Sequence, residues 1–393
     1  MDVEKSLQDK LAGKTFVVDK KATDGETRTL LDVDSSFADF KESLDIKTTD
    51  VNYIPEELKV EFGDYVINSA TEEQIIISNN HMKLSHQGIF QHTFSGDNKD
   101  TTTPLKMPDY TTSVSYVDEA EFFIGCDSGR KVFLHRDGDT IANFGVCAPN
   151  NSTVPVFSTR GNSVAYRTSA TSCNFIADIA FADLDSNSVT EIKGVPVHHA
   201  IERVIVISNK HILIVGQEGE IFIYDSSGEQ VSKLESQPEA VNGLVQHVEL
   251  SGDTRWLFIS YFDLDAGKPK IVTFEITMEN DISRKGEFEF SDDFKGDLKK
   301  SIGCIHAGLH HAGRTIVLLQ KSQGTVIDSE NDFHYEGPLE VLAMNDEGTP
   351  VSIKTIPMRY VRSRSIASDR QQTGFMINGT ENMTKIEIID TKK

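Results

Sequence analysis

The side chains best suited to binding form a basic cluster near the C-terminus, made of Lys354, Arg359, Tyr360, Arg362 and Arg364. Arg362 and Arg364 alternate along the chain, so on a strand they lie on the same face. Arginine makes bidentate contacts with carboxylates and phosphates and is enriched at protein interfaces. The cluster therefore predicts a partner-binding site. Pairing with the protein's own acidic residues is the competing explanation, which so acidic a chain favours slightly.

Two acidic segments have the spacing of calcium loops. Asp183, Asp185 and Asn187 alternate, and the segment 263–267 (Asp-Leu-Asp-Ala-Gly) is similar. Alternating oxygen ligands are typical of calcium loops. Asp, Asn and Gly between two apolar runs are also what a hairpin turn requires. Because neither segment has the complete loop pattern, we predict turns here rather than calcium sites.

Histidine and cysteine do not form a metal or redox motif. The doublets at 198–199 and 310–311 place neighbours on opposite faces of a strand, which is unsuitable for joint metal binding. No Cys-x-x-Cys pair occurs among the four cysteines, Cys126, Cys147, Cys173 and Cys304. Motifs of serine hydrolases, phosphate-binding loops, dinucleotide folds and zinc proteases are also absent from the sequence. We therefore predict no catalytic residue, no cofactor and no metal.

The charge of the chain limits its partners. Its 393 residues include 61 acidic and 39 basic side chains, for a net charge of −22. This charge argues against bulk binding to nucleic acid or to an anionic membrane, and would attract basic partners. The sequence shows no signal peptide and no apolar stretch near the roughly 20 residues of a membrane span. We therefore predict protein partners, in the cytoplasm or the nucleus.

A single repeated pattern predicts the elements that position these residues. Residues 212–224 combine an apolar run, a glycine turn and a second apolar run, and an Asp/Gly turn follows. Residues 121–144 repeat the pattern, and 74–94 and 374–390 are looser copies. Repeats of three or four antiparallel strands indicate a β-propeller. We predict an all-β, seven-bladed propeller with four-stranded blades over residues 64–393. The strand groups begin near Tyr65, Thr112, Val154, Arg203, Leu244, Ile302 and Arg359.

Residues 1–63 are predicted to form a partly helical extension that closes the ring. The last strand group supplies only three strands, so an exposed edge would remain without a fourth. The segments Thr15–Asp19 and Thr29–Asp34 are the two candidates for that strand. Residues 35–47 are predicted to be a short helix, capped at Ser35-Ser36, that packs on the propeller or docks a partner.

The segment 220–228 (Glu-Ile-Phe-Ile-Tyr-Asp-Ser-Ser-Gly) resembles the end of a WD repeat, in which an aromatic-Asp pair closes the third strand. Residues 388–391 and 181–183 are fainter versions. The only tryptophan, Trp256, is not followed by Asp, and no Gly-His pair occurs. The blades therefore lack the Asp-His-Ser/Thr-Trp network of that family. The chain is similar to a divergent WD-repeat propeller over residues 65–390.

This resemblance implies a non-enzymatic platform for protein complexes, such as a scaffold or adaptor subunit. The WD-repeat motif itself contains no catalytic residue. Two alternatives belong to other classes of function. One is a metal-dependent propeller hydrolase whose ligands come from several blades around the central channel. The other is a reader of phosphate-bearing ligands that uses Arg359, Arg362 and Arg364.

Overall fold

A computed structural model shows a chain made almost entirely of antiparallel strands. The structure describes residues 15–18, 29–32, 36–51, 65–70, 74–79, 89–93, 101–107, 111, 113–116, 123–126, 130–147, 157–169, 176–197, 201–235, 245–290, 302–311, 314–322, 334–336, 338–357, 360–368, 374–379 and 383–391. Among these residues no helix is long and apolar enough to cross a membrane.

Six four-stranded antiparallel sheets account for most of the described chain, and in five of them the strands pair in sequence order. The first three are β4 (Tyr65–Ala70), β5 (Gln74–Asn79), β6 (Ile89–Thr93) and β7 (Thr101–Pro104); β8 (Ser113–Tyr116), β9 (Phe123–Cys126), β10 (Lys131–Arg136) and β11 (Asp139–Val146); and β12 (Phe157–Arg160), β13 (Ser163–Arg167), β14 (Ile176–Asp183) and β15 (Ser188–Pro196). The next three are β16 (Ile201–Ser208), β17 (His211–Gly216), β18 (Ile221–Asp225) and β19 (Gln230–Leu234); β20 (Val245–Leu250), β21 (Trp256–Asp263), β22 (Lys268–Ile276) and β23 (Ile282–Glu289); and β24 (Ile302–His311), β25 (Arg314–Ser322), β27 (Leu339–Met344) and β28 (Pro350–Ile356).

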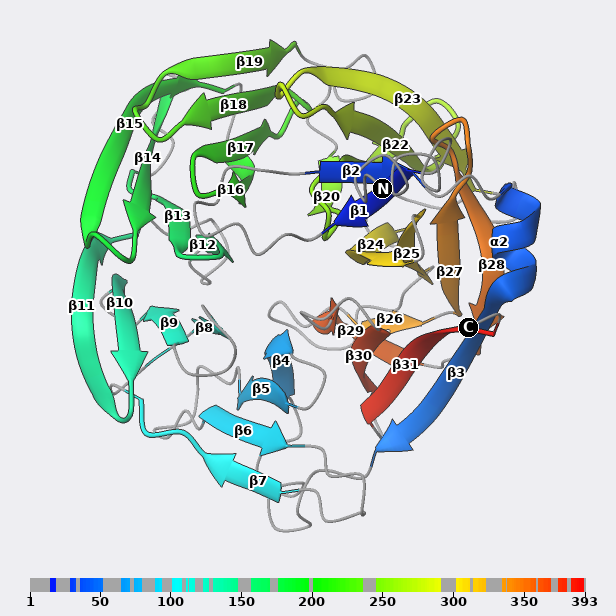
Figure 1. Ribbon diagram of the computed structural model, residues 1–393, viewed down its shortest axis with the longest axis horizontal. Helices are drawn as coiled ribbons and strands as arrows, with labels where there is room; N and C mark the ends of the chain where they lie inside the picture. The colour runs from blue at the N-terminus through cyan, green and yellow to red at the C-terminus, as the bar shows by residue number, and fades with distance from the viewer. Residues whose placement is uncertain are drawn as a thin grey trace, which may run out of the picture.

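The sheets stand around a central axis with their first strands innermost (Figure 1). Contacts between inner strands link β4 to β8, β12 to β16, β16 to β20 and β20 to β24. The hydroxyl groups of Ser115 on β8 and Thr159 on β12 are 3.1 Å apart and join the second sheet to the third. The predicted all-β propeller is confirmed, and six sheets have the predicted four antiparallel strands.

A five-stranded sheet closes the ring. Its order is β26 (His334–Glu336), β29 (Tyr360–Ser368), β30 (Gly374–Gly379), β31 (Met383–Asp390) and β3 (Leu44–Val51). Its inner strand β29 contacts β24 on one side and β4 on the other, so the last sheet meets the first. β3 pairs with β31 along its whole length, from Leu44 opposite Asp390 to Val51 opposite Met383. An N-terminal strand therefore supplies the outer edge of the C-terminal sheet.

The strand that closes the ring is not one of the two candidates drawn from the sequence. Those segments form β1 (Thr15–Val18) and β2 (Thr29–Asp32), which pair only with each other among the described strands. Residues 44–47, which were expected to be helical, instead begin β3. Ile46 is buried while Asp45 and Lys47 are exposed. This alternation suits an edge strand with one face on the core.

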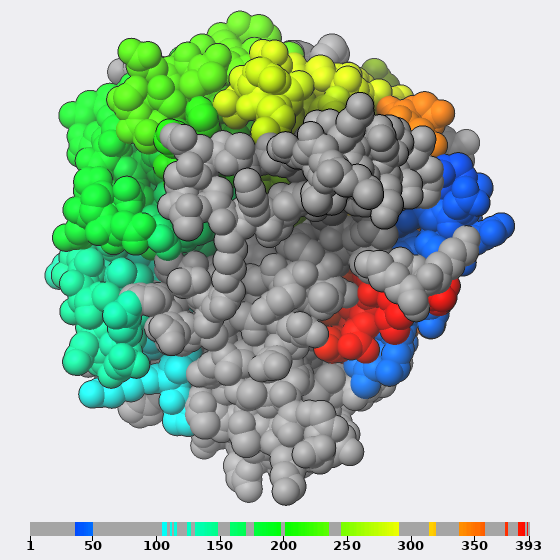
Figure 2. Space-filling model, in the orientation of Figure 1, coloured from blue at the N-terminus to red at the C-terminus, as the bar shows by residue number. Residues whose placement is uncertain are grey.

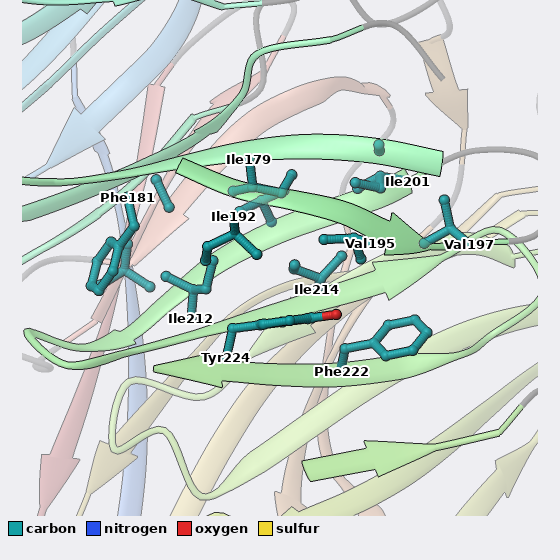
Figure 3. Close-up of a cluster of buried hydrophobic side chains, with 14 residues drawn as sticks. Ile179, Phe181, Ile192, Val195, Val197, Ile201, Ile212, Ile214, Phe222 and Tyr224 are labelled. Carbon is teal, nitrogen blue, oxygen red and sulfur yellow. The ribbon is translucent and has the colours of Figure 1, made fainter. Parts of the chain in front are cut away.

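The middle strands of the sheet β16–β19 are buried on both faces because this sheet is packed between two others. On β17, Ile212 and Ile214 join a core cluster with the preceding sheet, whereas Leu213 and Val215 join one with the following sheet. Figure 3 shows the first of these clusters, in which side chains of β14 and β15 meet those of β17 and β18. This arrangement explains why the sequence has continuous apolar runs there rather than alternation.

The only helix in the described part of the chain, α2 (Phe37–Ser43), packs on the flank of the propeller beside β28 and β3 (Figure 1). Ser36 is its N-cap, and the Ser36 hydroxyl accepts a hydrogen bond from the Asp39 N–H at 3.1 Å. Phe40 is buried in the core cluster shared by β25, β27 and β31. The Arg314 guanidinium lies over the rings of Phe37 and Phe40, at 5.4 and 5.5 Å from their centroids. The predicted cap and the packing of the helix on the propeller are confirmed.

The turn between β27 and β28 joins two neighbouring sheets through a hydrogen bond and a close packing contact. The Asn345 side chain accepts hydrogen bonds from the Glu347 and Thr349 N–H groups, at 3.1 and 2.8 Å. Gly348 has a φ of 79°, and its carbonyl accepts a hydrogen bond from the Thr273 hydroxyl of the adjacent sheet at 2.9 Å. A Cβ atom at Gly348 would lie 2.9 Å from the ring of Trp256. Only glycine satisfies both the positive φ and this close approach.

Candidate functional site

The structure separates the predicted basic cluster into two places. Lys354 lies on β28, the outermost strand of its sheet, and its Nζ donates a hydrogen bond to the Ile46 carbonyl of β3. Tyr360, Arg362 and Arg364 lie on β29 in the next sheet, where Arg362 pairs with His334 and Tyr360 with Glu336 of β26. Their side chains lie outside the described residues, as does Arg359. Lys354 therefore ties the closing strand to the neighbouring sheet.

The calcium-loop candidates form turns. The Asp183 carboxylate accepts hydrogen bonds from the N–H groups two and three residues further on, at 2.9 and 3.3 Å. The Asp185 carboxylate accepts one from the Asn162 side chain at 2.7 Å, and Asn187 has a φ of 52°. The first arrangement recurs at Asp263, with distances of 3.0 and 2.8 Å. Among the described residues, no group of three or more His, Cys, Asp or Glu is placed to hold a metal.

The segment that resembles a WD repeat also builds a turn. The Asp225 carboxylate accepts hydrogen bonds from the N–H groups of Ser227 and Glu229, both at 2.9 Å, and from the Ser227 hydroxyl at 2.6 Å. Burial alone would raise the pKa of Asp225, but these hydrogen bonds lower it below its ordinary value. The aromatic-Asp pair at 224–225 therefore stabilises the hairpin between β18 and β19.

A cavity of about 260 Å³ lies at the central channel, where the inner strands β8, β12, β16 and β20 come together. Sequence reasoning missed it because each strand contributes only two or three of its residues, so no local motif exists. The polar part of its lining consists of Ser115, Ser158, Thr159, Arg160, Arg203 and Glu249. Val114, Ile205, Val206 and Leu250 complete the wall.

Two charged groups from neighbouring sheets dominate the cavity. Within the described part of the chain, no hydrogen bond or ion pair occupies the Arg203 guanidinium, which is exposed to the channel. Glu249 keeps partial contact with the channel, yet protein surrounds it, and this burial raises the pKa of its carboxyl to about 7. The nearby Arg203 charge opposes that increase only in part. Arg160, the second guanidinium, donates to the Gly252 carbonyl at 2.9 Å.

Replacing Glu249 by Gln is expected to remove a pH-dependent loss of stability. The folded-state pKa of about 7 exceeds the ordinary value of 4.5, so the folded chain binds this proton more tightly than the unfolded chain. The contribution of Glu249 to the free energy of unfolding therefore falls as pH rises from about 5 to 8. As pH rises over that range, the free energy of unfolding of Glu249→Gln should increase by about 1–3 kcal/mol relative to that of the native protein. Urea unfolding at pH 5.5 and 8 measures this difference.

The control for that experiment is Glu229→Gln, which changes an exposed carboxylate on a turn. The difference between this control and the native protein should stay constant with pH. The same constant difference for Glu249→Gln would contradict the assignment of the titrating group.

No protein-family model matches the chain, and no curated protein matches it. Solved structures do match. A chain in the crystal structure of a mitotic checkpoint complex has 10% sequence identity and a TM-score of 0.54, covering 87% of this chain and 91% of its own length. The β-propeller domain of Cps50 (Swd1) from Myceliophteria thermophila has 11% identity and a TM-score of 0.57, covering 87% and 99%. The fold is that of a β-propeller.

A third solved structure, of a protein from Lactobacillus plantarum, has 16% identity and a TM-score of 0.51, and covers 78% of this propeller and 89% of its own length. At such identities the likeness concerns the fold. Because 1103 solved chains match the propeller, its architecture alone does not indicate one activity.

Proposed function

We propose that this propeller is a non-enzymatic protein-interaction platform, a scaffold or adaptor subunit of a multiprotein complex in the cytoplasm or nucleus. The observation that carries the proposal is a set of exposed apolar side chains on the outermost strands of three successive sheets. Ile141 and Val146 on β11 are 51% and 52% exposed, Val189 on β15 is 42% exposed and Val231 on β19 is 43% exposed. These strands form part of the rim in Figure 2, from teal to green.

Two further observations support protein partners. Apolar side chains exposed along edge strands favour contact with another chain, because those strands also present unpaired backbone groups. The chain in the mitotic checkpoint complex shows that a fold of this shape can be part of an assembly. The net charge of −22 favours a basic partner.

Affinity purification of the intact protein from its own cells, at low and moderate salt, tests the platform. We expect one or more partners in fixed stoichiometry that survive moderate salt, and a binary complex when the purified components are mixed. Recovery of a lone monomer that contains a metal and turns over a small substrate would overturn the proposal in favour of a propeller hydrolase.

The contribution of the rim is tested with two double variants of equal charge. Ile141→Asp combined with Val189→Asp should weaken the reconstituted complex by at least about tenfold, because it places two charges in an apolar contact. Thr140→Asp combined with Ser188→Asp adds the same charges to exposed polar positions on the same strands and should change affinity little. Equal losses for the two variants would show that the apolar positions are not the contact.

A further inference from the structure

We propose that the channel cavity is a binding site for a small oxyanion, a carboxylate or a phosphate group. Arg203 would bind the anion, the cavity hydroxyls would donate to it, and Glu249 would take up a proton when it binds. This inference goes beyond the interaction platform and does not depend on it. Nothing in the sequence motifs or in the named structural relatives assigns a ligand to this place.

The first argument is that hydrogen-bond donors converge on the cavity. The Ser158 hydroxyl accepts a hydrogen bond from the Val206 N–H at 3.0 Å, so its own hydrogen is available to donate. Ser115 and Thr159 share one hydrogen bond at 3.1 Å, in which either hydroxyl is the donor. Together with the guanidinium of Arg203, these groups suit an acceptor-rich ligand such as an oxyanion.

The second argument is charge. Several basic side chains are paired with carboxylates, as Arg255 is with Glu275 at 2.8 Å and Lys270 with Glu287 at 2.8 Å. Among the described residues Arg203 has no such pair, although the chain has a large excess of acid. The acidic residue in the described lining of the cavity is Glu249, whose carboxyl is largely neutral below about pH 7. With Arg160 also in the wall, the cavity has a net positive charge and favours an anion over a cation.

The protonation of Glu249 should be linked to the ligand. A neutral carboxyl can donate a hydrogen bond to an oxyanion, whereas a carboxylate would repel it. The charged groups that face Glu249 in the described cavity are Arg203 on β16 and Arg160 on β12. Binding should therefore be tighter at pH 6 than at pH 8.

The size of the cavity limits the ligand. Pockets for drug-sized molecules occupy about 300–1,000 Å³, so about 260 Å³ suits a compact anion of a few carbon atoms. The same chemistry could come from two sources, a free metabolite-sized acid or the acidic side chain of a segment that enters the channel. Both present an oxyanion to Arg203.

Calorimetry with the purified full-length protein, in a buffer without phosphate or carboxylate, tests the proposal. The probes are inorganic phosphate, citrate and the blocked tripeptide acetyl-Gly-Glu-Gly-amide, each at pH 6 and pH 8. We expect saturable binding of at least one probe with one site per chain. Because phosphate and citrate themselves gain negative charge between pH 6 and pH 8, the pH effect is taken relative to Glu249→Gln with the same probe, and on that scale the affinity of the native protein should be several-fold lower at pH 8. Citrate or phosphate binding indicates a free anion, whereas binding of the tripeptide alone indicates a side chain. Absence of saturable binding for all three would overturn the proposal.

Matched variants locate the site. Arg203→Gln should weaken binding by at least about tenfold, and Arg203→Lys by less, because the lysine keeps the charge but not the bidentate geometry. Arg284→Gln removes one positive charge from β23, the outer strand of the sheet that contains Glu249, and should leave affinity unchanged. Glu249→Gln should bind with little pH dependence. Equal losses for Arg203→Gln and Arg284→Gln, in variants with native thermal unfolding, would contradict the assignment.

Discussion

Removal of residues 1–52 is expected to leave the propeller open and prone to aggregate, whereas removal of residues 1–33 should leave a folded monomer. The longer deletion removes β3, which pairs with β31 along its full length. It also removes the buried side chains of Phe40 and Ile46 from the core shared by two sheets. The exposed edge of β31 would then be available to other chains. Within the described part of the chain, the shorter deletion removes β1 and β2 alone, and these two strands pair with each other.

Size-exclusion chromatography with light scattering distinguishes the two deletions. The chain without residues 1–52 should elute as large or heterogeneous species, and a synthetic peptide of residues 36–52 should restore part of the monomer. A monomer with the native unfolding midpoint would show that β3 is dispensable. If the chain that lacks only residues 1–33 also aggregates, β1 and β2 contribute to the closed ring.

Replacing Gly348 by Ala should lower the free energy of unfolding by about 3 kcal/mol. The backbone at Gly348 has a φ of 79°, a conformation that costs an L-residue about 1–2 kcal/mol. The added Cβ would also lie 2.9 Å from the Trp256 ring and 3.0 Å from the Lys285 Cβ. Overpacking of this kind adds about 1–3 kcal/mol. The turn cannot move away easily, because its carbonyl bonds to Thr273 across the junction.

Fluorescence reports this junction directly, because Trp256 is the only tryptophan in the chain. The matched control is Gly228→Ala. Gly228 has a φ of 90°, but an added Cβ would make only ordinary contacts at 3.8–3.9 Å. Gly228→Ala should therefore lose only the free energy that the positive φ costs an L-residue. Urea unfolding followed by tryptophan emission should show about twice the loss for Gly348→Ala. Equal losses would mean that the contact with Trp256 costs nothing.

The sequence predicted the parts of the fold that repeat within short distances. Apolar runs separated by Asp/Gly turns, as at 212–224, identify adjacent strands because the pairing is local. The closing strand could not be predicted in the same way. Its partner, β31, is distant in sequence, and residues 44–47 continue the apolar face of the preceding helix, so the helix appeared longer than it is.

The candidate site could not be predicted from the sequence because its residues are also distant from one another along the chain. Arg203 and Glu249 belong to different sheets, and the propeller brings them to one cavity only because both are on inner strands. Strand pairing within a single sheet, β8 to β11, brings Cys126 and Cys147 together, with their sulfur atoms 3.3 Å apart, although their spacing matched no cysteine motif. Conversely, Lys354 is close in sequence to Arg362 and Arg364, but the structure places Lys354 on an outer strand and the two arginines on β29 of the next sheet.

The position of the closing strand has a consequence for synthesis on the ribosome. β3 emerges among the first parts of the chain, but β31 ends at Asp390, three residues before the C-terminus. At about 5–20 residues per second, β3 waits roughly 20–70 s for its partner. Until β31 is made, the nascent chain exposes the unpaired backbone of β3 and the apolar face of the last sheet completed. Any message truncated before the codons for β31 therefore encodes a propeller that cannot close, and quality control can recognise it by those exposed surfaces.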